Sequence, residues 1–518
     1  MQNDKARLNP LPLLVVAFFG LIVAFHLGNA LLGRSLFRAI HLGTALEYSH
    51  GPINLLKPVI VGFNATGTPT AQELPIWQAV AGLLFRLTHS QWYGWANVTS
   101  LFFFALGLWP FFALARQYIG ERAAWWSLAF FLTQPLIVIM AGEASTDGYC
   151  LMTTLWFLYC AERLIRTGKL VWWLPTALLA ALSAISKLPF FMAAGWCSIF
   201  ILTSINLRSW RSWLLLAGAG IFAAGVFVAW KHYTDNLAAQ AVYPYQELRP
   251  AKSASMALWY FGDLHYRLSP ATWLKGGWRF LHATMGSLPT AALFLAALFQ
   301  RGNRMSKLWL LGTLLTTLVF THLVLVHWHY YLMCCPAVAM LCGVTLARWE
   351  KFWTQEMPVT WLRYGLTALI LVFSTVDGVI ATKISIYYDL YPKRMSAIIS
   401  EHTAPTDKLV VFGGDWGGEE LFRAGRNGFY VFNLESTPGD PCKGLTELLN
   451  NPDDLRRLKS LGYNKLVLIS ESPVRFAAVA VNPGSNRQRL FYPENVSPTV
   501  DAWPVVYHSE DILIKDIP

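Results

Sequence analysis

The sequence predicts a polytopic α-helical membrane protein with a small α/β domain at its C-terminal end. Over 518 residues, 55% of the side chains are hydrophobic and only 14% are charged. A soluble chain of this length needs a more polar surface, whereas a membrane protein exposes apolar side chains to lipid. The 23 Trp and 20 Tyr residues agree with a membrane protein, because their rings favour the membrane–water interface.

The predicted membrane spans are long apolar stretches. A helix needs about 20 mostly apolar residues to cross the bilayer core. The sequence contains about eleven such stretches, at 11–32, 97–115, 123–141, 148–162, 170–186, 189–206, 213–230, 286–300, 308–327, 331–347 and 361–381. The first is too long for the core of a signal peptide, so we predict an uncleaved first helix.

The orientation of the spans follows from the short connections between them. Cytoplasmic connections are rich in Lys and Arg. With the N-terminus in the cytoplasm, every cytoplasmic connection is basic, while the 141–147 connection on the other side has no Lys or Arg. This topology places the loops 33–96 and 231–285, and all residues after 381, outside the cytoplasm.

A change of composition divides the chain into two predicted domains, a membrane domain of residues 1–383 and an extracytoplasmic domain of residues 384–518. In the second, KLVVFGGD, EELFRAG, GFYVFNL and KLVLIS alternate between strand-like and helix-like patterns. The strand-like stretches are apolar throughout, as in a parallel sheet that is covered on both faces. We therefore predict a small α/β domain.

Charge and cysteine content exclude several classes of function. The net charge of +11 has no accompanying nucleic-acid motif, and we attribute it to cytoplasmic helix ends or to attraction of lipid phosphates. The seven Cys residues form no CxxC pair and no disulfide framework. His327 and His329 would point apart on a helix, so we predict no metal site there.

Two acids stand out in the connection 141–147, where Glu143 and Asp147 lie in the otherwise apolar sequence GEASTDGYC. An ionisable group near a membrane span indicates a functional site. The alternative is a structural role, in which Asp147 or Thr146 caps the helix that follows.

The loop 33–96 carries three further candidates, Arg38, His41 and Glu73. Arg38 and His41 could share one helical face, and His41 is one of few groups in the loop that could act as a base. Alternatively, His41 is a structural histidine, and Glu73 favours the start of a helix through the helix dipole. The basic and aromatic loop 231–285 is either an interfacial anchor or a basic rim for an anionic lipid headgroup.

Several segments resemble the GT-C fold polyprenyl-phosphate-sugar glycosyltransferases of family 39, which include protein O-mannosyltransferases and lipid A aminoarabinose transferases. The resemblance rests on ELPIWQAVAGLLFRL, on FFALARQYIGERAAWWSLAFFLTQPLIVIMAGEASTDGYCLMTTLWFL and on AISKLP. Later in the chain, HYYLMCCPAVAMLCG and VVFGGDWGGEELFRAGR also resemble family segments. The resemblance covers most of the chain through the order and spacing of these segments.

The resemblance implies an inverting sugar transfer at the outer face of a bacterial inner membrane. An acid in the first loop would deprotonate the acceptor hydroxyl, and basic residues would hold the departing polyprenyl phosphate. The acid that family members carry just before Arg38 is absent here, where the sequence reads RSLF. The base is therefore one of His41, Glu73 or Asp147.

The remaining candidate residues would bind the lipid phosphate or the sugar: Arg38, Glu143, Lys187, Arg249, Lys252, Arg267, His329 and Tyr330. The expected partners are a polyprenyl-phosphate sugar, an envelope lipid, glycan or protein as acceptor, and membrane lipids. No divalent metal or other cofactor is implied. The alternatives are a transporter or flippase of lipid-linked glycans and a non-catalytic subunit of envelope assembly.

Overall fold

The computed structural model describes residues 10–28, 35–59, 73–90, 92–205, 209–239, 254–356, 360–382, 386–413, 419–431, 456, 458–469, 502–509 and 512–518. The chain forms two compact units. The membrane unit comprises Met1–Ala30, Ala96–Lys231 and Ala251–Ile384. The second unit comprises Leu31–Trp95, His232–Pro250 and Ser385–Pro518.

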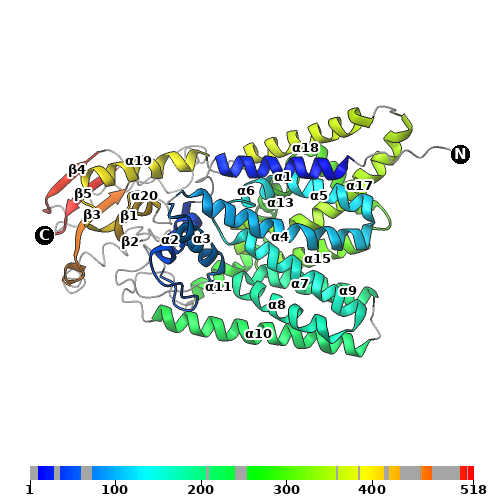
Figure 1. Ribbon diagram of the computed structural model, residues 1–518, viewed down its shortest axis with the longest axis horizontal. Helices are drawn as coiled ribbons and strands as arrows, with labels where there is room; N and C mark the ends of the chain where they lie inside the picture. Colours follow the sequence, from blue (N-terminus) through cyan, green and yellow to red (C-terminus); the bar gives the residue numbers. More distant parts are fainter. Residues whose placement is uncertain are drawn as a thin grey trace. The chain divides into compact units, whose positions relative to one another are not determined.

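The membrane unit is built of helices (Figure 1). They are α1 (Leu11–Gly28), α4 (Gly94–Ile119), α5 (Glu121–Thr133), α6 (Pro135–Met140), α7 (Asp147–Thr167), η1 (Leu170–Trp172), α8 (Trp173–Ser186), α9 (Leu188–Ile205), α10 (Trp210–Ala239, which continues into the second unit), α11 (Ala254–Phe261), α12 (Leu264–Leu268), α13 (Pro270–Thr284), α14 (Leu288–Phe299), α15 (Arg304–Val319), α16 (Thr321–Val326), η2 (Trp328–Cys334), α17 (Cys335–Glu356) and α18 (Thr360–Thr382).

Every predicted membrane span coincides with one or two of these helices. Five of the described helices are long and apolar enough to cross a membrane, and the pair α13–α14, which bends by 101°, would make a sixth. Other spans are shorter or broken. The stretch 123–141 breaks at Gln134, before Pro135 at the first position of α6, because proline has no N–H to continue the preceding helix.

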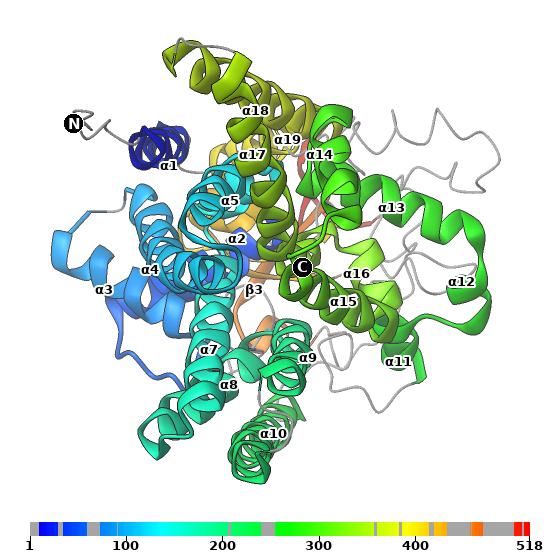
Figure 2. The ribbon, with the colours of Figure 1, turned by 90° about the vertical axis from the view of Figure 1, so that its right-hand side faces the viewer.

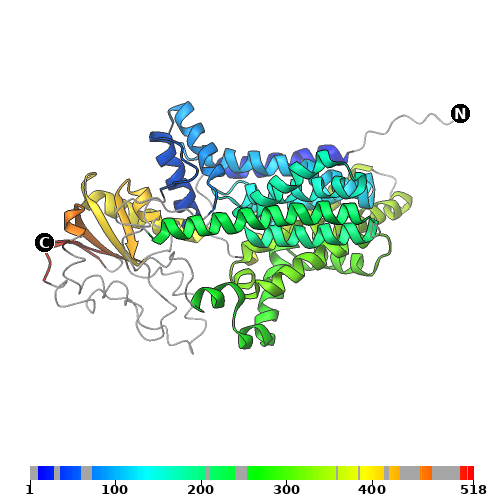
Figure 3. The same ribbon diagram turned by 90° about the horizontal axis from the view of Figure 1, so that it is seen from below.

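The apolar surface of these helices agrees with a lipid environment. Figure 2 shows α7, α8 and α9 lying side by side, and the three helices contact one another. In contrast, α10 exposes Leu214, Ile221 and Val228, and only 17% of its most apolar stretch is buried. Figure 3 shows α10 as a long, straight helix. The chain is therefore a membrane protein.

In its described residues, the second unit holds a sheet and four helices. The helices are α2 (Ser35–His50), α3 (Ile76–Thr88), α19 (Ile386–His402) and α20 (Glu419–Arg423), and the strands are β1 (Lys408–Gly413), β2 (Asn427–Val431), β3 (Tyr463–Ile469), β4 (Val505–His508) and β5 (Ile512–Asp516). The strand order is β2-β1-β3-β5-β4. As predicted, β1 runs parallel to β2 and β3. The prediction missed β5 and β4, which extend the sheet in antiparallel fashion.

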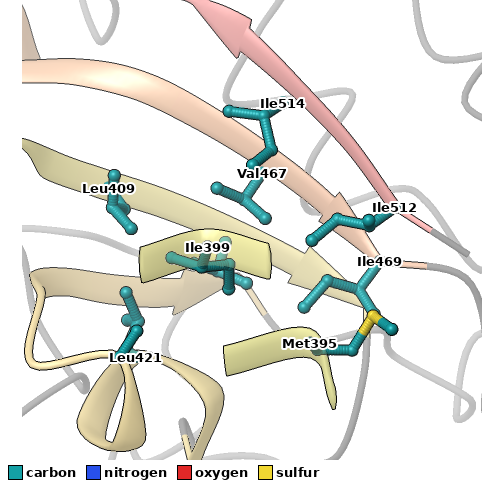
Figure 4. Packing of buried hydrophobic residues seen from close by; sticks show 10 residues of the cluster. Met395, Ile399, Leu409, Leu421, Val467, Ile469, Ile512 and Ile514 are labelled. Carbon is teal, nitrogen blue, oxygen red and sulfur yellow. The ribbon is translucent and has the colours of Figure 1, made fainter. Parts of the chain in front are cut away.

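The core of this sheet forms between one of its faces and two helices. Met395 and Ile399 of α19, together with Leu421 of α20, pack against strand residues such as Leu409 and Val467 (Figure 4). All five side chains are at most 1% exposed. The apolar strand patterns that predicted an α/β domain thus match strands buried in the sheet.

Candidate functional site

The two acids of the connection 141–147 lie in a buried turn between α6 and α7, which we call the acid turn. Glu143 and Asp147 are both 0% exposed. Asp147 is the first residue of α7, and the preceding Thr146 makes no capping hydrogen bond through its side chain. Capping by Thr146 therefore does not explain the turn, although the carboxylate of Asp147 has the favourable sign for a helix N-terminus.

Lys187 meets the acid turn from the break between α8 and α9. Its backbone is extended, with φ −151° and ψ 102°. Its Nζ donates to Oδ1 of Asp147 in an ion pair whose side chains are 3% and 0% exposed. The same Nζ lies 5.6 Å from the centre of the Tyr330 ring. Ser145 donates to the other carboxylate oxygen of Asp147 at 3.1 Å.

This ion pair is buried, unlike a second ion pair in the membrane unit. In the pair Arg122–Glu350, the arginine side chain is 43% exposed. Exposed pairs add little stability, and removal of two charges from water costs several kcal/mol per ion. The buried pair Lys187–Asp147 therefore adds little to stability by itself. Buried charges in a membrane domain indicate a functional site.

The ion pair lies where two helices begin. α7 starts at Asp147 and α9 starts at Leu188, directly after Lys187. Helix N-termini carry a partial positive charge and unpaired N–H groups, and they favour anions. Two such ends and an ammonium group together can bind an anionic ligand, with Asp147 as the counter-ion of Lys187.

The acid turn is held by residues that the sequence analysis missed. Asn97 Nδ2 donates to the carbonyl of Gly142 at 2.6 Å, and Ser100 Oγ donates to that of Glu143 at 2.5 Å. His26 on α1 is hydrogen-bonded to Val138 O at 2.8 Å, and a Cβ at Gly142 would collide with its ring. A lone histidine in an apolar stretch was the one signal that could have pointed to this contact.

The candidates of the first loop lie in the second unit, in the helix pair α2–α3. His41 is 4% exposed, and its Nδ1 is hydrogen-bonded to Gln78 Nε2 at 2.8 Å. Arg86 donates to carbonyl groups at the C-terminal end of α2. Burial raises the pKa of Tyr48 to about 12, so its hydroxyl stays protonated and donates to Asn54 O at 2.6 Å.

Two more candidates of the first loop are described less completely. Glu73 is half-buried, three residues before the start of α3. Arg38 lies in α2, but its side chain is outside the described part of the chain. The structure thus groups Asp147, Lys187 and Tyr330 in the membrane unit, whereas Arg38, His41 and Glu73 belong to the second unit.

The remaining predicted residues divide into two groups. His329 is buried beside Tyr330, with the ring centres 4.5 Å apart. Arg267 donates to Leu318 O at 2.7 Å and so ties α12 to α15. Arg249 and Lys252 lie outside the described residues.

The two histidines beside Trp328 do not point apart as a regular α-helix would require. They lie in or next to the 3₁₀ turn η2, where their ring centres are 5.5 Å apart. Among the described residues, no group of three or more metal-ligating side chains is present.

Comparison with known proteins identifies the fold. No protein-family model and no curated sequence matches the chain. Its structure is similar to the crystal structure of ArnT from Cupriavidus metallidurans bound to undecaprenyl phosphate, with a TM-score of 0.57 and 14% identity over 98% of both chains. The apo state of that ArnT matches with a TM-score of 0.55 and 14% identity over 97% of this chain and 98% of that chain. The chain therefore shares the fold of ArnT along almost its entire length, which confirms the predicted polytopic fold of GT-C type with a C-terminal sheet domain.

Proposed function

We propose that the protein is a membrane glycosyltransferase that moves a sugar from a polyprenyl-phosphate donor to an envelope lipid, glycan or protein. The observation that carries the proposal is the buried ion pair of Lys187 and Asp147 at two helix N-termini. Support also comes from the fold, because the similar ArnT structure holds undecaprenyl phosphate. A polyprenyl carrier requires a membrane-embedded enzyme, and this chain has apolar spans.

Lys187 is the residue we assign to the donor phosphate. When the sugar leaves its carrier, the bond between the anomeric carbon and the phosphate oxygen breaks, and the electron pair stays with the phosphate. The acceptor oxygen forms the new bond and loses its proton to a base. An ammonium group in a site without water stabilises the growing phosphate charge more strongly than it would in bulk solvent.

Asp147 has a different role in this proposal, since its two oxygens accept from Lys187 and Ser145. Both oxygens are thus engaged by a cation and a hydroxyl, which suits the carboxylate to hold that cation in place. We therefore assign Asp147 to the orientation of Lys187. The base for the acceptor hydroxyl stays a prediction, with Glu73 and His41 as the candidates from the sequence.

In this proposal the site lies at the outer face of a bacterial inner membrane. The basic connections predict that the acid turn and the α8–α9 break lie on the same, non-cytoplasmic side. The ion pair between these two segments supports this topology, because it requires them to meet. The sheet domain would then be periplasmic.

The test is turnover of a polyprenyl-phosphate sugar by purified protein with envelope extracts as acceptors. We expect wild-type protein to release polyprenyl phosphate and the Lys187→Met variant to release far less. Lys307→Met is the matched control, because Lys307 lies in a predicted cytoplasmic connection and donates to the backbone of Gln300.

Two results would contradict the proposal. Equal turnover by Lys187→Met and wild-type protein would remove Lys187 from the site. Binding of the donor without release of polyprenyl phosphate from any sugar of a panel would favour a flippase or a non-catalytic assembly subunit instead.

A further inference from the structure

Two polar side chains on the first turns of α4 support the acid turn. Asn97 and Ser100 are three residues apart, so they share one face of the helix. Both are 0% exposed. Asn97 binds the carbonyl of Gly142 at 2.6 Å, and Ser100 binds the carbonyl of Glu143 at 2.5 Å.

These hydrogen bonds hold the backbone of the turn against α4. The carbonyl of Glu143 also accepts from the N–H of Ser145 at 2.6 Å within the turn, and Ser100 adds a second donor from α4. α6 ends at Met140 and α7 starts at Asp147, so the residues between them are outside any helix. Buried carbonyl groups without a partner cost free energy comparable to a lost hydrogen bond. Asn97 and Ser100 thus stabilise one conformation of the turn that ends at Asp147.

Lys187 is held by contacts within α8 and between α8 and α7. Its backbone N–H donates to Ser183 O at 2.9 Å. The hydroxyl of Ser183 is in turn hydrogen-bonded to that of Thr154 on α7 at 2.8 Å. We therefore expect loss of the α4 contacts to displace the acid of the ion pair more than its lysine.

From this arrangement we infer that Asn97 and Ser100 are positioning residues, which act through the acid turn to hold Asp147 against Lys187. The inference rests on the proposed function, because it assigns the ion pair to the donor phosphate. A small displacement of a positioned group can cost on the order of a hundredfold in rate. The loss should be larger in kcat than in KM, since the phosphate gains charge as the sugar leaves.

The test compares Ser100→Ala and Asn97→Ala with two reference variants. Ser100→Thr keeps the hydroxyl group. Ser198→Ala is the matched control, because Ser198 is equally buried but bonds only within its own helix, to Ala194 O at 2.9 Å. For each variant, kcat and KM for the donor are measured per folded molecule, together with binding of undecaprenyl phosphate in nanodiscs.

We expect kcat to fall on the order of tenfold or more in Ser100→Ala and Asn97→Ala. Ser100→Thr should recover most of the rate, and Ser198→Ala should match wild-type protein. Binding of undecaprenyl phosphate should weaken in the first two variants only. If Asn97→Ala fails to fold, the comparison of Ser100→Ala with Ser100→Thr tests the inference.

The inference is overturned if Ser100→Ala equals Ser198→Ala in both kcat and lipid binding. It is also overturned if Ser100→Ala loses activity only in proportion to its folded fraction. Failure of the proposed function gives a different result, in which wild-type protein binds undecaprenyl phosphate but turns over no donor. In that case the binding measurements on the same variants still decide the role of Asn97 and Ser100.

Discussion

The acid turn of the membrane unit and the helix pair α2–α3 of the second unit are both polar segments in a mostly apolar chain. The polar groups of the two segments have different kinds of partner. In α2–α3, Arg86 and His41 bond to a helix end and to a neighbouring side chain. In the acid turn, two backbone carbonyls accept from side chains of α4, and Asp147 pairs with Lys187. A segment is therefore a stronger candidate for a site when its charges are buried and meet other charges rather than the backbone.

The difference has a physical basis. Arginine has five N–H donors in a planar fork, which suits it to bind several carbonyl groups at once. Arg86 uses this fork on Tyr48, Ser49 and Gly51. A lysine buried beside an aspartate instead retains a compact charge, and a phosphate can compete for it.

The largest expected effect is that of Lys187→Met. Turnover should fall by on the order of a hundredfold or more, because the departing phosphate loses its cation. Stability should also fall by about 3–5 kcal/mol, since the charge of Asp147 stays buried without a partner. Thermal melting in detergent and a turnover assay measure the two effects.

A double variant separates stability from function at this site. Lys187→Met with Asp147→Leu removes both charges, so most of the lost stability should return while turnover stays low. Recovery of turnover in the double variant would show that the ion pair serves the fold alone.

Asp147→Asn should have a smaller effect on turnover than Lys187→Met. The amide keeps the shape and an oxygen acceptor for Lys187 but removes the countercharge, so we expect about a tenfold loss of kcat. Glu350→Gln is the control, because it removes the acid of the partly exposed pair with Arg122. Similar losses in both variants would mean that the buried pair has no special role.

The sequence predicted the spans well because about 20 apolar residues suffice to specify a membrane helix. The predicted span 148–162 corresponds to the 21-residue helix α7. The stretches KLVVFG and KLVLI lie in the parallel strands β1 and β3. Glu143, Asp147 and Lys187 were found as isolated charges among apolar residues.

The parts that the sequence did not predict depend on contacts between distant segments. The ion pair joins residues 40 positions apart, and no local pattern specifies which charge meets which. Asn97 and Ser100 look like ordinary polar residues at a helix start until the fold brings Gly142 and Glu143 against them. The antiparallel strands β4 (Val505–His508) and β5 (Ile512–Asp516) lie far along the chain from β3 (Tyr463–Ile469), so spacing along the chain did not reveal their place in the sheet.

His41→Ala should affect the second unit more than the chemistry. Its hydrogen bond with Gln78 and its contact with Trp77 join α2 to α3, so we expect a loss of about 1–3 kcal/mol in stability. Turnover per folded molecule should change less than about threefold, which would leave Glu73 as the candidate base. A large loss of kcat with unchanged melting would instead confirm His41 as the base that the sequence proposed.

Arg86→Lys should produce the smallest effect. Lysine keeps the charge but lacks the planar fork, so the last carbonyl groups of α2 lose some of their hydrogen-bond donors. Because Arg86 is only part-buried, water can replace the lost donors. We expect a loss of about 1 kcal/mol and faster hydrogen exchange in the last turn of α2, with turnover unchanged. Because the charge is conserved, a loss of turnover without faster exchange would mean that the fork itself binds substrate. Arg86 would then belong with Lys187 among the residues that act on a ligand, and the distinction drawn between the two segments would fail.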